Sequence, residues 1–99
     1  MTESVVSLDS VVSRIADDTL IMETLDDEVV MLRLQDGLCF GLNRMGSVVW
    51  RHLDCEISIA GVCDALLREY HVDRMTCEKQ VLAIIESLQS ERLVLVRQP

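Results

Sequence analysis

The side chains of this sequence best suited to metal binding or nucleophilic chemistry are those of its four cysteines and two histidines. Zinc sites usually contain at least one pair of cysteines in CxxC spacing, and no two of these cysteines have it. One histidine precedes a cysteine by three residues, but no second pair completes a set of ligands. We therefore expect no metal ion and no cofactor, and we expect thiols that pack as small hydrophobic side chains. The residues considered are Cys39, Cys55, Cys63, Cys77, His52 and His71.

Catalysis finds equally little support in the sequence. No Ser–His–Asp or Cys–His arrangement stands out, and neither His52 nor His71 has an evident partner. We therefore expect no catalytic residues, and an enzyme is the class of protein that the sequence favours least.

Length and composition indicate one small globular domain. The chain has 99 residues, of which 49% are hydrophobic and 26% charged, as is typical of a folded protein. Its apolar runs are too short to span a membrane, and Met1-Thr2-Glu3 lacks the basic start of a secretory signal. The expected location is the cytoplasm.

The charge of the chain argues against nucleic acid as a partner. The net charge is −8, and the basic residues are one lysine and eight scattered arginines. A nucleic-acid binder must neutralise phosphates with clustered Lys and Arg, and the overall field of this chain would repel a duplex.

The segment from Glu28 to Trp50 predicts a strand, a turn, a second strand and a helix with almost no connecting residues. Asp36-Gly37 lies between the predicted strands Glu28–Leu34 and Leu38–Leu42, and this pair predicts a two-residue hairpin turn with positive φ. Asn43 is expected to cap the helix that follows. A short strand at a sheet edge beside a helix can bind an extended peptide.

The preceding residues predict a third strand. Thr19–Glu23 is the expected first strand, and Asp26-Asp27 the turn before Glu28, which together give a three-stranded antiparallel meander. Residues 1–18, with the apolar stretch from Val5 to Ile15, are expected to form an arm or a loose strand, and residues 19–96 the remainder of a single domain.

Three helices are expected after the sheet, because apolar residues recur at helical spacing. Ser58 is the expected cap of the second helix and Thr76 that of the third, while Leu93–Val96 predicts a terminal strand or an apolar tail. The fold class is therefore α+β and winged-helix-like, with Trp50 closing the core against the sheet. The residues expected on the inner helix faces are Met45, Val48, Val49, Leu53, Ile59, Val62, Cys63, Leu66, Leu67, Tyr70, Cys77, Val81, Ile84, Ile85 and Leu88.

Several of these segments together resemble the signature of the PqqD-like family. The resemblance covers residues 20–96 and rests on the order of short motifs, each of low specificity alone. Members are RiPP recognition elements, small winged-helix-like domains that bind the leader of a ribosomally made precursor peptide. The likeness is strongest to the stand-alone members from lasso-peptide clusters, and it rests on the segments Val11–Arg14, Glu28–Met31 and Val72–Glu78. The motifs are Asp36-Gly37, Phe40-Gly41-Leu42-Asn43, Gly46, Trp50, Ile59 to Asp73, and Val81 to Val94.

The resemblance implies how a peptide would bind. In such domains the leader adds as a strand beside the third strand, here Leu38–Leu42, and its apolar side chains enter a groove formed with the third helix, here Cys77–Glu91. The backbone role would fall to Cys39, Phe40 and Gly41. The apolar helix residues fit an ordinary core equally well. The complete set of expected peptide-binding residues is Leu38, Cys39, Phe40, Gly41, Leu42, Cys77, Gln80, Val81, Ile84, Ile85 and Leu88.

The resemblance also implies partners and leaves alternatives open. The expected function is non-catalytic: the domain would hold the precursor peptide and present it to a separate protease and cyclase. The alternatives are a pyrroloquinoline quinone precursor-peptide chaperone and a winged-helix DNA-binding regulator, and whether the same edge forms a homodimer is open. Two positions depart from the family pattern, since Cys39 replaces a frequent aromatic residue and Arg92 replaces a usual glycine.

Overall fold

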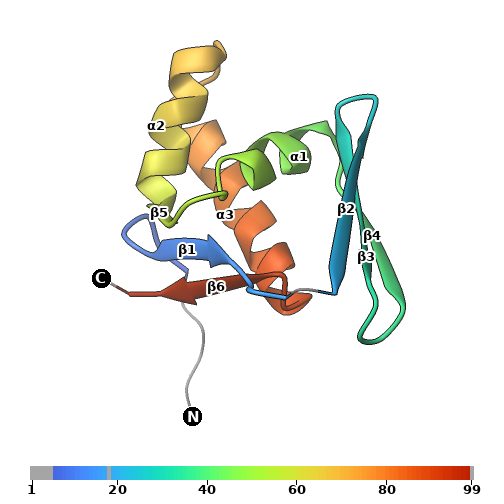
Figure 1. Ribbon diagram of the computed structural model, residues 1–99. Helices are drawn as coiled ribbons and strands as arrows, with labels where there is room; N and C mark the ends of the chain where they lie inside the picture. Colours follow the sequence, from blue (N-terminus) through green and yellow to red (C-terminus); the bar gives the residue numbers. More distant parts are fainter. Residues whose placement is uncertain (1–5, 18, 99) are drawn as a thin grey trace. The chain divides into compact units, whose positions relative to one another are not determined.

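The computed structural model describes residues 6–17 and 19–98 (Figure 1). The chain divides into two compact units. One contains residues 16–51, and the other contains the residues up to 15 and those from 52 onward.

The unit of residues 16–51 is an antiparallel sheet followed by a helix. Its strands β2 (Leu20–Leu25), β3 (Glu28–Arg33) and β4 (Leu38–Gly41) lie in the order β2-β3-β4, and α1 (Arg44–Arg51) follows (Figure 1). The predicted three-stranded meander is thereby confirmed.

The two turns of the meander differ from each other. Asp26 and Asp27 have φ values of 51° and 69°, so the two-residue turn with left-handed backbone joins β2 to β3. The prediction of such a turn at Asp36-Gly37 is wrong. Only Gly37, at φ 73°, is left-handed there, and the connection comprises the four residues 34–37. Asp36 is instead engaged through its side chain, which accepts hydrogen bonds from the Arg33 Nε.

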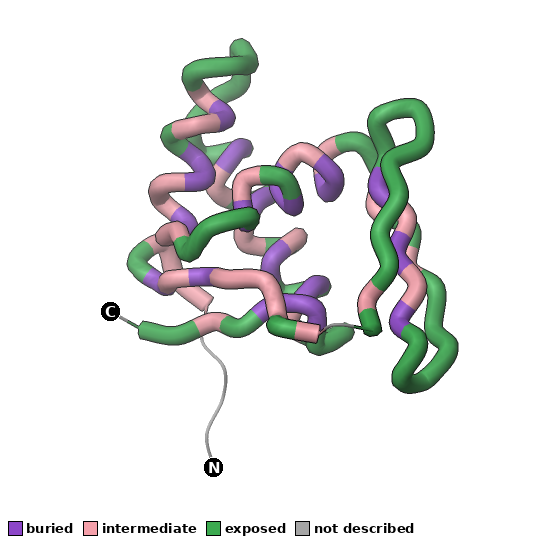
Figure 2. The backbone as a smooth tube through the Cα atoms, in the orientation of Figure 1, coloured by how far each residue is buried: buried purple, intermediate pink, exposed green. Residues whose placement is uncertain are grey.

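Helix α1 packs on one face of this sheet. Its Asn43 cap is confirmed, because the Asn43 Oδ1 accepts a hydrogen bond from the Gly46 N–H at 2.8 Å. Trp50 is buried as expected, and its indole Nε1 donates to the Met22 Sδ at 3.2 Å. Within this sheet, the buried residues of the strands all lie on β3, the central strand (Figure 2).

The second unit contains a sheet that the sequence did not predict. Strands β5 (Ile57–Ser58), β1 (Val11–Arg14) and β6 (Val94–Arg97) pair in the order β5-β1-β6, all antiparallel. The loose segment expected before residue 19 thus includes an ordered strand, while residues 1–5 and 18 lie outside the described residues. The terminal segment forms a strand rather than a tail.

Two helices complete this unit. They are α2 (Ile59–Glu69) and α3 (Arg74–Ser90), which pack against each other. Ser58 caps α2 as predicted, since its Oγ accepts from the Gly61 N–H. Thr76 does not cap α3: the cap is Asp73, whose carboxylate accepts from the Thr76 N–H at 3.0 Å, so α3 begins three residues earlier than Cys77.

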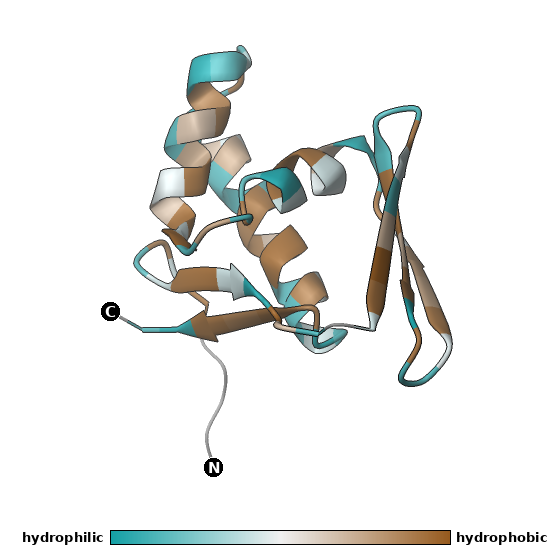
Figure 3. Cartoon of the chain, viewed as in Figure 1, coloured by the Kyte–Doolittle hydropathy of each residue, from teal (hydrophilic) through white to brown (hydrophobic). Residues whose placement is uncertain are grey.

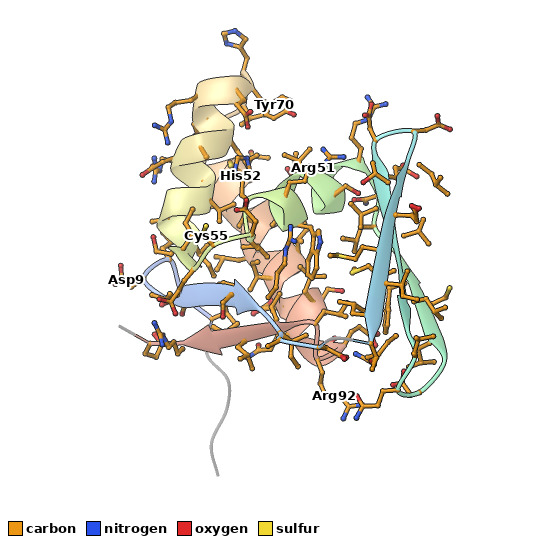
Figure 4. All side chains as sticks on the ribbon, viewed as in Figure 1. Asp9, Arg51, His52, Cys55, Tyr70 and Arg92 are labelled. Carbon is orange, nitrogen blue, oxygen red and sulfur yellow. The ribbon has the colours of Figure 1, made fainter. Side chains whose placement is uncertain are left out.

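Most residues predicted for the inner helix faces are buried, with exceptions at the margins. Met45, Val48, Leu67 and Ile84 are half-buried and Tyr70 is exposed at the end of α2 (Figure 4). Figure 3 shows apolar residues on β6 and along the helices of this unit. In the described residues, no helix is long and apolar enough to cross a membrane.

Helix α3 ends in a Schellman motif built on an arginine. The Leu93 N–H donates to the Leu88 carbonyl at 3.0 Å, and the Arg92 N–H donates to the Gln89 carbonyl at 2.9 Å. Arg92 occupies the left-handed position, with φ 60°. Members of the PqqD-like family usually have glycine at this position, and the backbone here keeps the left-handed conformation that glycine adopts readily.

Candidate functional site

Strand β4 is one edge of its sheet. Its residues pair with β3 in the register Val30 with Gly41, Met31 with Phe40, Leu32 with Cys39, and Arg33 with Leu38. No other strand of the described chain pairs with β4. One side of this strand is therefore open to a further strand.

The register decides which backbone groups face the open side. The Leu42 N–H donates to the Val29 carbonyl at 2.9 Å, so the backbone of Leu42 is directed to β3. Hydrogen-bonded residues alternate along an antiparallel strand, so Phe40 is also directed to β3, while Cys39 and Gly41 are directed outward. The sequence-based expectation was different, because it assigned the backbone contact with the peptide to Phe40 as well as to Cys39 and Gly41.

A buried serine of α1 closes the β3–β4 ladder. The Ser47 Oγ accepts a hydrogen bond from the Val29 N–H at 2.8 Å and lies 3.1 Å from the Leu42 carbonyl, to which it donates. Ser47 is 0% exposed. Because its hydroxyl stands between the two strands, it fixes the end of β4 from which α1 departs. The sequence reasoning missed this role, since a single serine in a helix carries no distinguishing signal.

The other end of β4 is fixed by an arginine. Arg33 is buried; its Nε donates to both Asp36 oxygens at 3.1 Å, and its guanidinium lies 4.8 Å from the Phe40 ring centroid. Asp36 Oδ1 also accepts from the Leu38 N–H at 3.3 Å. The hydrogen bonds from Arg33 lower the pKa of Asp36 below its ordinary value. The hairpin loop and the Phe40 ring are thus held before any ligand arrives.

The side chains of β4 divide between two faces of the sheet. Leu38 and Phe40 share the face that carries buried Val29 and Met31, whereas Cys39 and Gly41 share the opposite, outer face. Leu38, Cys39 and Gly41 are exposed, and Phe40 and the following Leu42 are half-buried (Figure 2). The strand contains no charged residue.

The opposite edge of the sheet, β2, has a different character. It carries Glu23 at its centre, and the acidic residues Asp26, Asp27 and Glu28 follow directly. Charged side chains on an edge strand disfavour the addition of another strand. Of the two edges, β4 is therefore the better suited to pair with an extended peptide.

The residues of α3 expected at the peptide site lie in the other unit and differ in accessibility. Within α3, Gln80 is exposed and Ile84 is half-buried. The remaining expected residues, Cys77, Val81, Ile85 and Leu88, are buried.

The exposed surface of α3 is poorly suited to DNA. Of its two basic residues, Arg74 is ion-paired with Asp64 and Glu78, and Lys79 is accompanied by the exposed acidic residue Glu86. A recognition helix normally presents Arg or Lys to bases and phosphates, so this composition argues against a duplex.

The residues considered for other chemistry do not converge on one site. Cys63 and Cys77 are buried, and burial, followed by the influence of Cys77, raises the pKa of the Cys63 thiol to about 11. Cys55 is exposed in the loop before β5, and the His52 Nε2 lies 3.2 Å from a Glu69 carboxylate oxygen (Figure 4). Among the described residues, no group of three or more His, Cys, Asp or Glu is placed to hold a metal ion.

Comparison with known proteins adds a family and two structures. Residues 28–94 match the family described as coenzyme PQQ synthesis protein D (PqqD). A structure described as TbiB1 in complex with the TbiA(beta) leader peptide is 35% identical, covers 79% of this chain and 91% of its own, and has a TM-score of 0.65. A structure of lasso peptide synthetase B1 complexed with the leader peptide is 26% identical, covers 79% and 92%, and has a TM-score of 0.68. Among the curated proteins, no sequence matches this chain.

Proposed function

This chain belongs to the PqqD family, and we propose that it binds the leader segment of a ribosomally synthesised precursor peptide by strand addition to β4. The observation that carries the proposal is the open, uncharged β4 edge, whose outward backbone groups belong to Cys39 and Gly41. Main-chain hydrogen bonds would supply affinity that is independent of sequence, and side-chain contacts would supply selectivity.

The lasso-peptide pathway is the preferred setting. Both similar structures described above contain a leader peptide, and one of them, 26% identical to this chain, is described as a lasso peptide synthetase B1. The quinone pathway is supported only by the name of the family. The domain would act without catalysis, as a carrier that raises the effective concentration of the precursor at a separate protease and a separate cyclase.

The side chains that would contact the leader are the accessible members of the expected set. On the sheet these are Leu38, Cys39, Phe40 and the following Leu42, together with the backbone of Gly41. On α3 we assign the contact to Gln80 and Ile84, because the other expected residues of that helix are buried and serve its packing. The proposal of strand addition rests on the residues at the sheet edge, and the contact with α3 is an addition that it does not require.

An N-methyl scan of the peptide tests strand addition. The probe is the TbiA(beta) leader peptide, which is present in the similar structure that is 35% identical to this chain. N-methylation removes a hydrogen-bond donor, so affinity measured by calorimetry should fall at every second residue of the paired segment. Uniform losses, no losses, or failure of the unmodified peptide to bind would refute the proposal.

Two protein variants with matched controls test the contacts. Phe40→Asp should abolish binding at micromolar concentrations, whereas Gln35→Asp in the exposed hairpin loop should not change it. Ile84→Asp should weaken binding, and Ala83→Asp, at the exposed neighbouring position of α3, should not. If Ile84→Asp is folded and binds like the wild type, α3 takes no part, although the β4 proposal stands.

A further inference from the structure

Nothing within the chain itself explains why position 41, at the open edge, is a glycine. Gly41 lies within β4, where glycine weakens a strand because it has no side chain to pack. Its φ is not in the left-handed region, and a Cβ added to it would meet no atom within 4 Å. By contrast, Gly37 has φ 73°, and a Cβ on Gly61 would meet the Ile57 Cγ1 at 2.9 Å. Neither backbone conformation nor crowding therefore requires Gly41.

The surroundings of Gly41 are accessible, and its nearest neighbours are apolar. On the outer face of the sheet its cross-strand neighbour is Val30, which is half-buried, and Cys39 lies two residues away on the same strand and face. Leu32 and Ile21 continue this face on one side, and Ile21 is 49% exposed, whereas Glu23, which pairs with Val30, and Glu28 border it with exposed carboxylates. The missing side chain thus leaves an uncovered apolar surface directly beside the open edge.

The geometry points to Gly41 as the residue that sets which side chain the bound peptide presents on the outer face. In a paired strand, the peptide residue beside Gly41 has its side chain on the same face as Gly41. Neighbouring strands lie about 4.8 Å apart, so a side chain that crosses Gly41 to reach Val30 must be long. An aromatic ring laid over a strand glycine meets this requirement. The occupant is therefore a large apolar side chain of the leader, preferably aromatic.

This inference depends on the proposed strand addition at β4, and it adds a size requirement at one position of the peptide. A valine at position 41 would occupy the space over which the large side chain lies. Valine favours strands and its Cβ would meet no atom within 4 Å, so Gly41→Val should fold at least as stably as the wild type. The leader should bind Gly41→Val about tenfold more weakly, as expected for overpacking of a fitted contact.

The test is an alanine scan of the leader against both proteins. On the wild type, one large apolar residue of the paired segment should lose about tenfold in affinity when replaced by alanine, whereas on Gly41→Val the same replacement should cost almost nothing. The control is Thr24→Val on the exposed β2 strand, which adds the same side chain at the other edge and should leave the scan unchanged.

The outcomes separate this inference from the proposed function. If the wild type shows the alternating N-methyl pattern but Gly41→Val gives the same affinity and the same alanine scan, Gly41 has no selective role and strand addition stands. If the alternating pattern is missing, strand addition fails and the inference fails with it. Urea unfolding of Gly41→Val confirms that any loss of binding is not a loss of fold.

Discussion

Replacement of Ser47 by alanine should destabilise the sheet that carries the β4 edge. The hydroxyl of Ser47 accepts the Val29 N–H at 2.8 Å and donates to the Leu42 carbonyl at 3.1 Å, and the residue is 0% exposed. Ser47→Ala removes one oxygen and deprives two backbone groups of their partner. The methyl group that remains cannot replace either hydrogen bond.

The magnitude follows from the burial of those groups. A buried donor or acceptor left without a partner costs about 1–3 kcal/mol, so two fully buried groups would cost about 2–6 kcal/mol. Because the hydrogen bond to the Leu42 carbonyl is only partly buried, the free energy of unfolding should fall by an amount in the lower part of this range, about 2–4 kcal/mol. The Leu42 N–H still donates to the Val29 carbonyl at 2.9 Å, so the strands remain paired beside the defect and the loss should not exceed this range.

Urea unfolding followed by tryptophan fluorescence measures this loss directly. Trp50 is the single tryptophan of the chain and lies on α1, in the same unit as Ser47, so its emission reports on the affected sheet and helix. The matched control is Ser90→Ala: the exposed Ser90 Oγ donates to the Ser87 carbonyl at 2.8 Å, and its loss should cost about 0.5 kcal/mol or less. If Ser47→Ala costs no more than Ser90→Ala, the hydroxyl does not hold the ladder, and the account of how β4 is fixed is wrong.

Two further predictions concern the end of α3 and the hairpin loop. Arg92→Gly should raise the free energy of unfolding by about 0.5–1 kcal/mol in thermal or urea unfolding, because Arg92 is held at φ 60° and glycine adopts this conformation without steric cost; an unchanged or lower stability would contradict the assignment of strain there. Asp36→Asn should be less stable than the wild type at pH 6, and the two urea midpoints should converge as the pH falls below about 4. The sign follows from the lowered pKa of Asp36, whose ionised form stabilises the fold above its ordinary pKa and is lost on protonation. A difference between the two proteins that stays constant with pH would refute the role of the Arg33 ion pair.

The sequence predicted those elements whose signals are local. The order of β2, β3 and β4, the Asn43 cap and the burial of Trp50 each follow from residues close together in the chain, and all are confirmed. The β5-β1-β6 sheet was missed because its strands are two to four residues long and their partners lie more than 40 residues apart. Local sequence patterns do not indicate which distant segments pair with each other.

The errors at single residues also have physical reasons. Asp36 and Asp73 are both engaged through their carboxylates, with Arg33 and with the Thr76 N–H respectively. The first engagement accompanies a four-residue loop in place of the expected tight turn, and the second moves the start of α3. A sequence pattern shows that an aspartate is present but not which of several nearby donors it will accept.

The candidate site was predictable only in part for the same reason. The sequence indicated that Leu38–Leu42 forms a strand that can lie at an edge, and the structure places β4 at the edge. Which backbone groups face outward depends on the register with β3. A shift of one residue would turn the backbone groups of Phe40 outward and those of Cys39 and Gly41 toward β3. Register could not be read from the chain, because it is fixed by the Ser47 and Arg33 contacts at the two ends of β4.

Residue-resolved amide hydrogen exchange, with and without the TbiA(beta) leader peptide, tests the central claim most directly. In the free protein the N–H groups of Phe40 and Leu42 should be protected by β3, while those of Cys39 and Gly41 should exchange rapidly. Addition of the leader should slow exchange at Cys39 and Gly41 by about tenfold or more, in proportion to site occupancy. Slow exchange at Cys39 and Gly41 already in the free protein, or no change there when the leader is bound, would contradict strand addition at β4.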